Sequence, residues 1–194
     1  MFLHSRIVCG LIIDCGQVAE MPYNQQQVII LVGNVGTGKT TWTRKYLKKC
    51  NSTSYKNFVA LDSDSISTML SGIGRYYWQE SRKELYSELK KVILNTCLKS
   101  GYSVIIDGIH ATRKHRKVYI DIAHKYEADV IIVDFGPGNL GSLERRYNDN
   151  RGLSKTRWKR VHRLYQDMYE MPSIYLDKVD IVYLPYEFYN LRRK

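Results

Sequence analysis

The residues most plainly suited to chemistry form one short run that reads Gly-Asn-Val-Gly-Thr-Gly-Lys-Thr. Two glycines flank four residues and are followed by a lysine and a hydroxyl residue, which is the spacing of a phosphate-binding loop. Backbone N–H groups in such a loop surround the phosphates, the lysine contacts the β- and γ-phosphates, and the hydroxyl binds Mg²⁺. The pattern predicts an ATP and Mg²⁺ site, with Lys39 as the catalytic cation and Thr40 as the metal ligand. The residues expected to hold the nucleotide are Gly33, Asn34, Val35, Gly36, Thr37, Gly38, Lys39, Thr40 and Thr41.

Carboxylates follow two further apolar runs of the chain. Asp62 and Asp64 come after one run, and Asp107 comes after the next. Ligands of open parallel sheets bind beyond the carboxyl ends of the strands, so these aspartates are expected to face the nucleotide. A hydrolytic ATPase usually places a water-activating glutamate after its Mg²⁺-side aspartate, whereas Gly108 follows Asp107 here. Transfer to an acceptor hydroxyl is therefore favoured over hydrolysis. The structural alternative for each aspartate is a helix N-cap or a turn.

A basic segment follows the fourth apolar run and a glycine-rich turn. Arginines on such a segment can act as a lid that neutralises the charge on a transferring phosphoryl group, and we select Arg146 and Arg151 for this role. Further cations surround Trp158, and Tyr165 lies beyond them, an arrangement that suits nucleic acid. We expect Lys159 and Arg163 to contact the substrate. The alternatives are a solvated basic face for the cations and core packing or adenine stacking for Trp158.

The elements that must position these residues alternate between short apolar runs and longer helical stretches. This alternation predicts an α/β fold with a doubly wound, parallel five-stranded sheet. The strands are expected at Val28–Val32, Phe58–Leu61, Ser103–Ile106, Val130–Val133 and Asp180–Leu184. The helices are expected at Thr40–Lys49, Glu80–Lys99, Lys114–Tyr126 and Trp158–Tyr169. We expect an N-terminal extension over residues 1–26 and one P-loop kinase domain over residues 27–190, with its lid at about 136–158.

The composition is that of an intracellular globular protein with anionic partners. The chain has 194 residues and a formal net charge of +11, which favours nucleic acid or a phosphorylated substrate. Its four cysteines lack the paired spacing of a zinc site or redox dithiol. No apolar run is long enough to span a bilayer, and the apolar run near the N-terminus is followed at once by Asp14. A cytoplasmic location is expected, and the sequence assigns no oligomeric state.

Taken together, the motifs resemble the P-loop kinases related to the phage-type polynucleotide 5′-hydroxyl kinase, within the AAA-type and zeta-toxin-like small kinases. Beyond the loop, the resemblance rests on Thr41-Trp42, Arg44, Asp64, Ser100-Gly101-Tyr102, Val104-Ile105-Ile106-Asp107, Asn148, Arg151, Leu164-Tyr165 and Met168. It implies a nucleotide-kinase-like fold with a basic lid and an enzyme that phosphorylates the 5′-hydroxyl of a DNA or RNA end, as in nucleic acid repair. It also implies that Asp64 is the general base, that Asp107 helps position the acceptor, and that the lid arginines clamp the phosphates. We expect Asp62 to bind the substrate as well.

Two positions depart from the pattern of this family. An arginine commonly stands three residues after the base, where this chain has Ser67, and another stands in the lid at the position of Tyr147. Because loss of the first arginine removes an acceptor contact, a kinase of a nucleoside, nucleotide or other small metabolite stays an alternative. A nucleic-acid-binding module that binds ATP without transferring phosphate is a second alternative, and Asp64 argues against it.

Overall fold

The structure is a computed structural model that describes residues 26–51, 57–74, 76–147 and 153–183. The expected N-terminal extension lies outside these ranges apart from Gln26, and so does Arg151. None of the helices in the described parts of the chain is long and apolar enough to cross a membrane.

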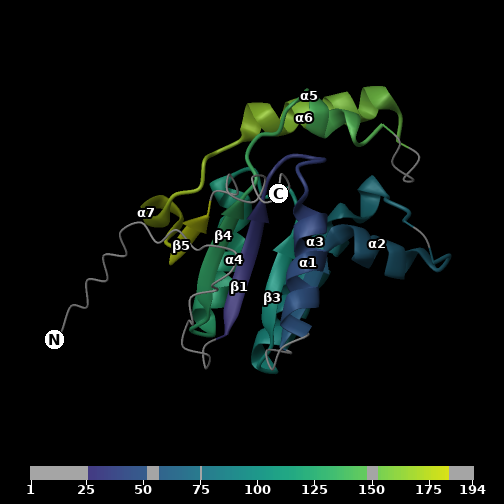
Figure 1. Cartoon of the computed structure of the whole chain (residues 1–194). Coiled ribbons are helices and arrows are strands. Elements are labelled where there is room, and N and C mark those ends of the chain that lie inside the picture. The colour runs from purple at the N-terminus through teal and green to yellow at the C-terminus, as the bar shows by residue number, and fades with distance from the viewer. Residues whose placement is uncertain (1–25, 52–56, 75, 148–152, 184–194) are drawn as a thin grey trace.

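A parallel sheet forms the centre of the protein (Figure 1). Its strands are β1 (Gln27–Val32), β2 (Phe58–Asp62), β3 (Ser103–Asp107), β4 (Asp129–Asp134) and β5 (Ile181–Tyr183), in the order β2-β3-β1-β4-β5. Each neighbouring pair is parallel. Almost every residue of β1 and β3 is buried, as expected of strands with helices on both faces. The predicted α/β class with a parallel sheet is confirmed.

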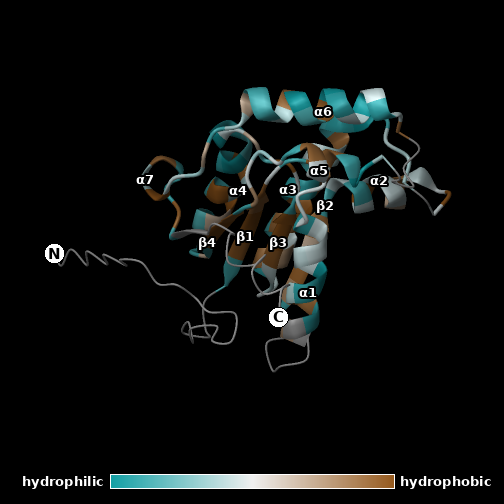
Figure 2. Cartoon of the chain, turned by 45° about the horizontal axis from the view of Figure 1, so that its top comes forward, coloured by the Kyte–Doolittle hydropathy of each residue, from teal (hydrophilic) through white to brown (hydrophobic). Residues whose placement is uncertain are grey.

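Side chains of β1 point alternately into two apolar layers. Val28 and Ile30 belong to the larger core cluster, whereas Ile29 and Leu31 belong to a second cluster with Trp42 of α1 (Lys39–Asn51). The larger cluster includes buried residues of α3 (Lys83–Lys99) and α4 (Arg113–Lys125). Figure 2 shows the apolar strands between these helices. The two clusters hold the phosphate-binding loop between β1 and α1 on a rigid base.

In the described parts of the chain, helices occur where they were expected, and three further helices were not predicted. These three are α2 (Ser63–Ser71), α5 (Leu140–Glu144) and α7 (Ile174–Asp177), while the 3₁₀ turn η1 (Glu80–Arg82) precedes α3. Helix α2 is rich in serine and threonine, which are weak helix formers. It forms because Asp62 caps its first turn, Gly72 adopts a left-handed conformation after its last, and Ile66 is buried in the core.

Helices α5 and α6 (Lys155–Met168) lie across the carboxyl edge of the sheet, above the loop that follows β1 (Figure 1). A third apolar cluster joins them to this loop through Val35, Leu143 and Trp158. The predicted lid region therefore packs on the phosphate-binding loop. Trp158 is 3% exposed and Tyr165 is 1% exposed, so both rings are core residues. Of the alternatives for Trp158, core packing is the one that the structure supports, because α6 turns Trp158, His162 and Tyr165 inward.

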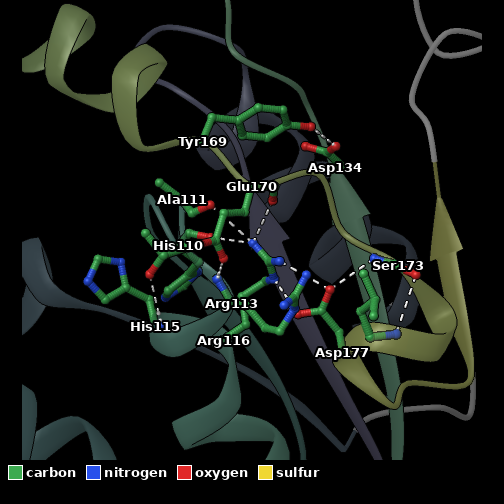
Figure 3. A network of polar contacts seen from close by, with 12 residues as sticks. His110, Ala111, Arg113, His115, Arg116, Asp134, Tyr169, Glu170, Ser173 and Asp177 are labelled. Carbon is green, nitrogen blue, oxygen red and sulfur yellow. Dashed lines mark hydrogen bonds and ion pairs between the residues drawn. The ribbon is translucent and has the colours of Figure 1, made fainter.

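A buried ion pair joins the chain after α6 to helix α4 (Figure 3). The Arg116 guanidinium bonds both carboxylate oxygens of Asp177, at 2.8 and 3.1 Å, and both side chains are fully buried. The same guanidinium donates to the carbonyl oxygens of His110, Ala111 and Glu170. The network thus joins α4, the loop after β3 and the segment between α6 and α7.

Asp177→Asn is expected to lower the free energy of unfolding by about 3–5 kcal/mol, because it leaves a buried guanidinium without its counter-ion. Urea unfolding followed by circular dichroism measures the change. Asp121→Asn is the matched control, since Asp121 pairs with Lys117 on the surface of α4 and such pairs contribute about 0–1 kcal/mol. Equal losses in the two variants would contradict the structural role of the buried pair.

Candidate active site

The phosphate-binding loop runs from the end of β1 into the first turn of α1. Gly36 and Gly38 have φ angles of 73° and 102°, which favour glycine. A Cβ atom at Gly36 would lie 1.8 Å from the Ser142 carbonyl oxygen, so α5 approaches the loop too closely for any side chain there. The positive end of α1 points toward the loop, as a phosphate site requires.

Lys39 lies inside the curve of this loop. Its ammonium donates to the Gly33 and Asn34 carbonyl oxygens, each at 2.7 Å, and its side chain is largely buried. The Thr37 hydroxyl donates to the Asn34 carbonyl oxygen at 2.8 Å. The loop therefore has a fixed shape with a cation at its centre, which is the arrangement that binds a polyphosphate.

Asn34 and Arg145 connect the loop to the elements above it. The buried Asn34 side-chain amide donates to the Pro137 carbonyl oxygen at 2.7 Å and to that of His162 in α6 at 3.0 Å. Arg145 donates from Nε to the Gly36 carbonyl oxygen at 3.0 Å. The sequence predicted a role for Arg146 and none for Arg145, because nothing in a run of two arginines shows that Arg145 bonds the loop.

Thr40 and Asp107 form a hydrogen-bonded pair between α1 and the end of β3. The Thr40 hydroxyl donates to Asp107 Oδ2 at 2.9 Å. Burial raises the pKa of the Asp107 carboxyl, while the nearby Lys39 ammonium and the Thr40 hydroxyl oppose that rise. Asp107 was predicted to position the acceptor, and the structure places its carboxylate against the hydroxyl expected to bind Mg²⁺.

Asp62 and Asp64 lie on the neighbouring strand end and the helix that follows it. The Cα atoms of Asp62 and Asp107 are register partners in the β2–β3 pair, so the aspartates do meet at one edge. Asp62 accepts from the Ser65 backbone N–H at 2.7 Å and from the Ser65 hydroxyl at 2.6 Å, which is the helix-capping alternative. Asp64 stands half-buried in the first turn of α2.

Lys90 is a buried residue of α3 for which the sequence predicted no role. It is 3% exposed, and Asp62, Asp107 and Asp64 each favour its charged form. Burial outweighs them and lowers the pKa of Lys90 to about 8. A signal existed in the sequence, because Lys90 stands four residues after Tyr86 and four before Leu94 in the buried stripe of α3.

The remaining predicted residues lie on the elements above the loop. The Arg146 guanidinium lies 5.8 Å from the centre of the Trp158 ring, and the Lys155 ammonium lies 5.3 Å from that of Tyr147. Lys159 and Arg163 are exposed on α6. A cavity of about 700 Å³ between α6 and η1 is lined by Glu80, Ser154, Thr156, Arg157, Arg160, Val161 and Leu164. The cations chosen from the sequence thus lie outside the set that lines this cavity.

Comparisons with known proteins agree with this fold. A family model described as an AAA domain matches residues 28–167. No curated protein sequence gives a significant match.

Solved structures share the fold at low sequence identity. A chain of the Pnkp1/Rnl/Hen1 complex is 20% identical with a TM-score of 0.52, and the match covers 68% of this chain but only 42% of that one. The APS kinase CysC of Mycobacterium tuberculosis, in complex with AMPPNP and APS, is 14% identical with a TM-score of 0.59 over 88% of this chain and 99% of that one. Kti12 of Chaetomium thermophilum, in complex with ADP-AlF3, is 18% identical with a TM-score of 0.56 over 81% and 87%. The phosphate-binding loop, the parallel sheet and the family match lead to one conclusion: the chain belongs to the AAA domain family and has the fold of a P-loop kinase.

Proposed function

We propose that the chain is an ATP- and Mg²⁺-dependent kinase that phosphorylates the 5′-hydroxyl of a nucleic acid end. The observation that carries the proposal is the meeting of two sets of residues at one sheet edge. The Thr40–Asp107 pair joins the phosphate-binding loop to β3, and β2 beside it ends in Asp62 and α2 with Asp64. A phosphate donor and a base for its acceptor would therefore lie side by side.

The donor side fits a Mg²⁺-bound nucleotide. The loop offers backbone N–H groups and the Lys39 ammonium to the β- and γ-phosphates. The Thr40 hydroxyl is a hard oxygen ligand of the kind Mg²⁺ prefers, and the Asp107 carboxylate 2.9 Å away would orient it. When bound there, the metal ion would supply positive charge to the β- and γ-phosphate oxygens.

Asp64 would act on the acceptor side. Its carboxylate would accept the proton of the acceptor hydroxyl as the new oxygen–phosphorus bond forms and the bond to the β-phosphate oxygen breaks. Asp62 would hold the first turn of α2, and with it Asp64, through its two bonds to Ser65. The products are a phosphate monoester and ADP.

Residues 136–158 would form the lid, with Arg146 and Arg151 neutralising charge on the transferred group. Contacts to the donor loop support this role, because Arg145 bonds Gly36 and Asn34 bonds both Pro137 and His162. A movement of α5 and α6 would therefore shift the loop residues that bind the phosphates.

The charge of α6 supports a nucleic acid as the acceptor. Its buried positions carry Trp158, His162 and Tyr165, while its exposed positions carry Lys155, Arg157, Lys159, Arg160 and Arg163. Two of these arginines line the cavity toward η1, and Lys159 and Arg163 lie on the neighbouring exposed stripe. A strand leaving the acceptor site along α6 would meet cations on either path.

Oligonucleotides with a free 5′-hydroxyl are expected to be phosphorylated with salt-dependent apparent affinity. If two or three phosphates are neutralised, log affinity should fall against log salt with a slope of roughly −1.4 to −2.1, because a single strand releases counterions on binding. Radiolabelled ATP and oligomers of increasing length, compared with matched nucleosides, measure this. Equal use of nucleosides together with no salt effect on oligomers would favour a small-molecule kinase.

Charge reversal on α6 provides a second arm of the same experiment. Lys159→Glu with Arg163→Glu should weaken oligonucleotide use far more than ATP binding, and Arg157→Glu with Arg160→Glu tests the cavity separately. The control reverses Lys45 and Lys48, which are exposed on α1. If the control variant loses as much oligonucleotide phosphorylation as the α6 variants, the net charge of the protein and not the position of the cations explains the effect.

A further inference from the structure

The cavity between α6 and η1 has walls that belong to the two halves of the proposed site. Helix α6 is joined to the phosphate-binding loop, because the Asn34 side-chain amide donates to the His162 carbonyl oxygen at 3.0 Å. The segment before η1 is joined to α2, because the Ser67 hydroxyl donates to the Tyr77 carbonyl oxygen at 2.8 Å. The cavity therefore lies between the helix above the phosphate-binding loop and the elements packed beside the helix that carries Asp64.

The residues on the α6 wall suit one unit of a nucleic acid strand. Arg157 and Arg160 supply two guanidinium groups, and no ion pair in the described parts of the chain involves either of them. Val161 and Leu164 supply aliphatic surface in the same cavity. The volume of about 700 Å³ lies within the range of about 300–1,000 Å³ that is usual for small-ligand sites. The cavity thus combines cations for a phosphate group with an apolar surface for the nucleoside beside it.

Glu80 places a negative charge in the same cavity, and a hydrogen bond fixes its position. The Trp78 indole N–H donates to Glu80 Oε2 at 3.1 Å. Trp78 itself packs against the larger core cluster, and the centre of its ring lies 4.7 Å from that of Tyr86. The Lys83 ammonium lies 3.7 Å from Glu80 Oε1, in an exposed pair that water weakens. Glu80 is therefore a carboxylate held in place by a side chain of the core.

We propose that this cavity holds the first internucleotide phosphodiester of the acceptor strand, and that Glu80 selects this group over a terminal phosphate. The proposal rests on the proposed function and defines its acceptor as a strand of at least two nucleotides. Two arginines and one glutamate give the lining a net charge of +1. A phosphodiester carries one negative charge, whereas a phosphate monoester carries about 1.5 to 2 at neutral pH. The diester matches the lining, and the Glu80 carboxylate repels the additional charge of the monoester.

Two acceptors that differ by one methyl group test the role of Glu80. A nucleoside 3′-(methyl phosphate) is a diester, and the corresponding nucleoside 3′-phosphate is a monoester. The wild-type protein should use the methyl ester with a kcat/KM about fivefold higher than that for the monoester. Glu80→Gln, whose amide oxygen can still accept from Trp78, should raise the kcat/KM for the monoester and remove this preference. Assays with radiolabelled ATP measure both acceptors.

Glu84→Gln is the matched control for this variant. Glu84 is exposed in the first turn of α3 and is not among the residues that line the cavity, so Glu84→Gln should keep the preference for the methyl ester. A Glu80→Gln protein that folds, as judged by its thermal melt, and keeps the wild-type preference would overturn the role of Glu80. An equal change of preference in the two variants would overturn it as well.

A neutral linkage tests the position of the phosphodiester. A methylphosphonate in a 5′-hydroxyl dinucleotide keeps the shape of the linkage and removes its charge. This replacement should lower kcat/KM about tenfold or more in the wild-type protein, but about twofold or less in Arg157→Gln with Arg160→Gln. Lys45→Gln with Lys48→Gln on α1 is the control and should behave as the wild type. An equal effect in the wild type and the α6 double variant would place the phosphodiester outside the cavity and overturn the proposal.

A binding measurement distinguishes failure of this proposal from failure of the proposed function. In an NMR titration without ATP, the dinucleotide should bind the wild type about tenfold or more tightly than it binds the Arg157→Gln, Arg160→Gln protein. Equal affinities, or no binding to the wild type, would overturn the assignment of the cavity. If the wild type phosphorylates no acceptor, the proposed function fails, and this titration still decides what the cavity binds. If oligonucleotides are phosphorylated and a neutral first linkage causes no loss, only the assignment of the cavity fails.

Discussion

Lys39→Ala is expected to reduce phosphotransfer to any acceptor by at least about a thousandfold, because the ammonium is the loop's own charge on the β- and γ-phosphates. The structure places this ammonium inside the loop, bonded to the Gly33 and Asn34 carbonyl oxygens. Single-turnover assays with radiolabelled ATP measure the loss. Lys39→Met, which better fills the buried space, should be equally inactive.

The fold should survive both changes at this position. Lys39 belongs to none of the apolar clusters, and the turns of the loop depend on glycines and on the Thr37 hydroxyl. Circular dichroism and the thermal melt test this. Lys45→Ala, on the exposed side of the same helix, should keep full activity. Full activity in Lys39→Ala would contradict the proposal that the protein is a kinase. Loss of the folded structure in this variant would mean that the lost activity reflects unfolding and not the missing ammonium.

Asp64→Asn is expected to lower turnover by at least about a hundredfold while ATP binding is retained, as when a positioned base is lost. The amide keeps the size of the side chain and cannot accept the proton. Fluorescent-nucleotide titration measures binding, and steady-state assays with a 5′-hydroxyl oligonucleotide measure turnover. Full ATP binding with full turnover in this variant would exclude Asp64 as the base.

Asp62→Asn provides the matched comparison for this variant. Asp62 receives the backbone N–H of Ser65, and asparagine caps helices about as well as aspartate. This change should therefore leave α2 in place and affect turnover much less than Asp64→Asn. The reverse order of effects would assign the base to Asp62. Nucleic acid binding without any phosphotransfer by the wild-type chain would instead support a binding module.

The donor half of the site could be predicted from the sequence because its information is local. The residues from Gly33 to Thr40 are consecutive in the chain. An apolar strand before them and a helix after them are enough to shape a phosphate-binding loop. The parallel α/β class followed from strands that are apolar throughout, since helices must cover both faces. The meeting of Asp62 with Asp107 also followed, because parallel strands end at one edge.

Only the tertiary structure determined the surroundings of residues that contact parts of the chain distant in the sequence. Lys90, Trp158 and Arg145 are ordinary residues of polar or amphipathic segments in the sequence, and their burial or contacts depend on how each helix is rotated against the sheet. A buried lysine and a lysine in solvent differ in charge environment, and the residues beside them in the sequence do not show which is which. The sequence by itself thus determined a phosphate-binding loop on a parallel sheet. The fold decided which cations reach it, because electrostatic and packing energies depend on separation in space rather than along the chain.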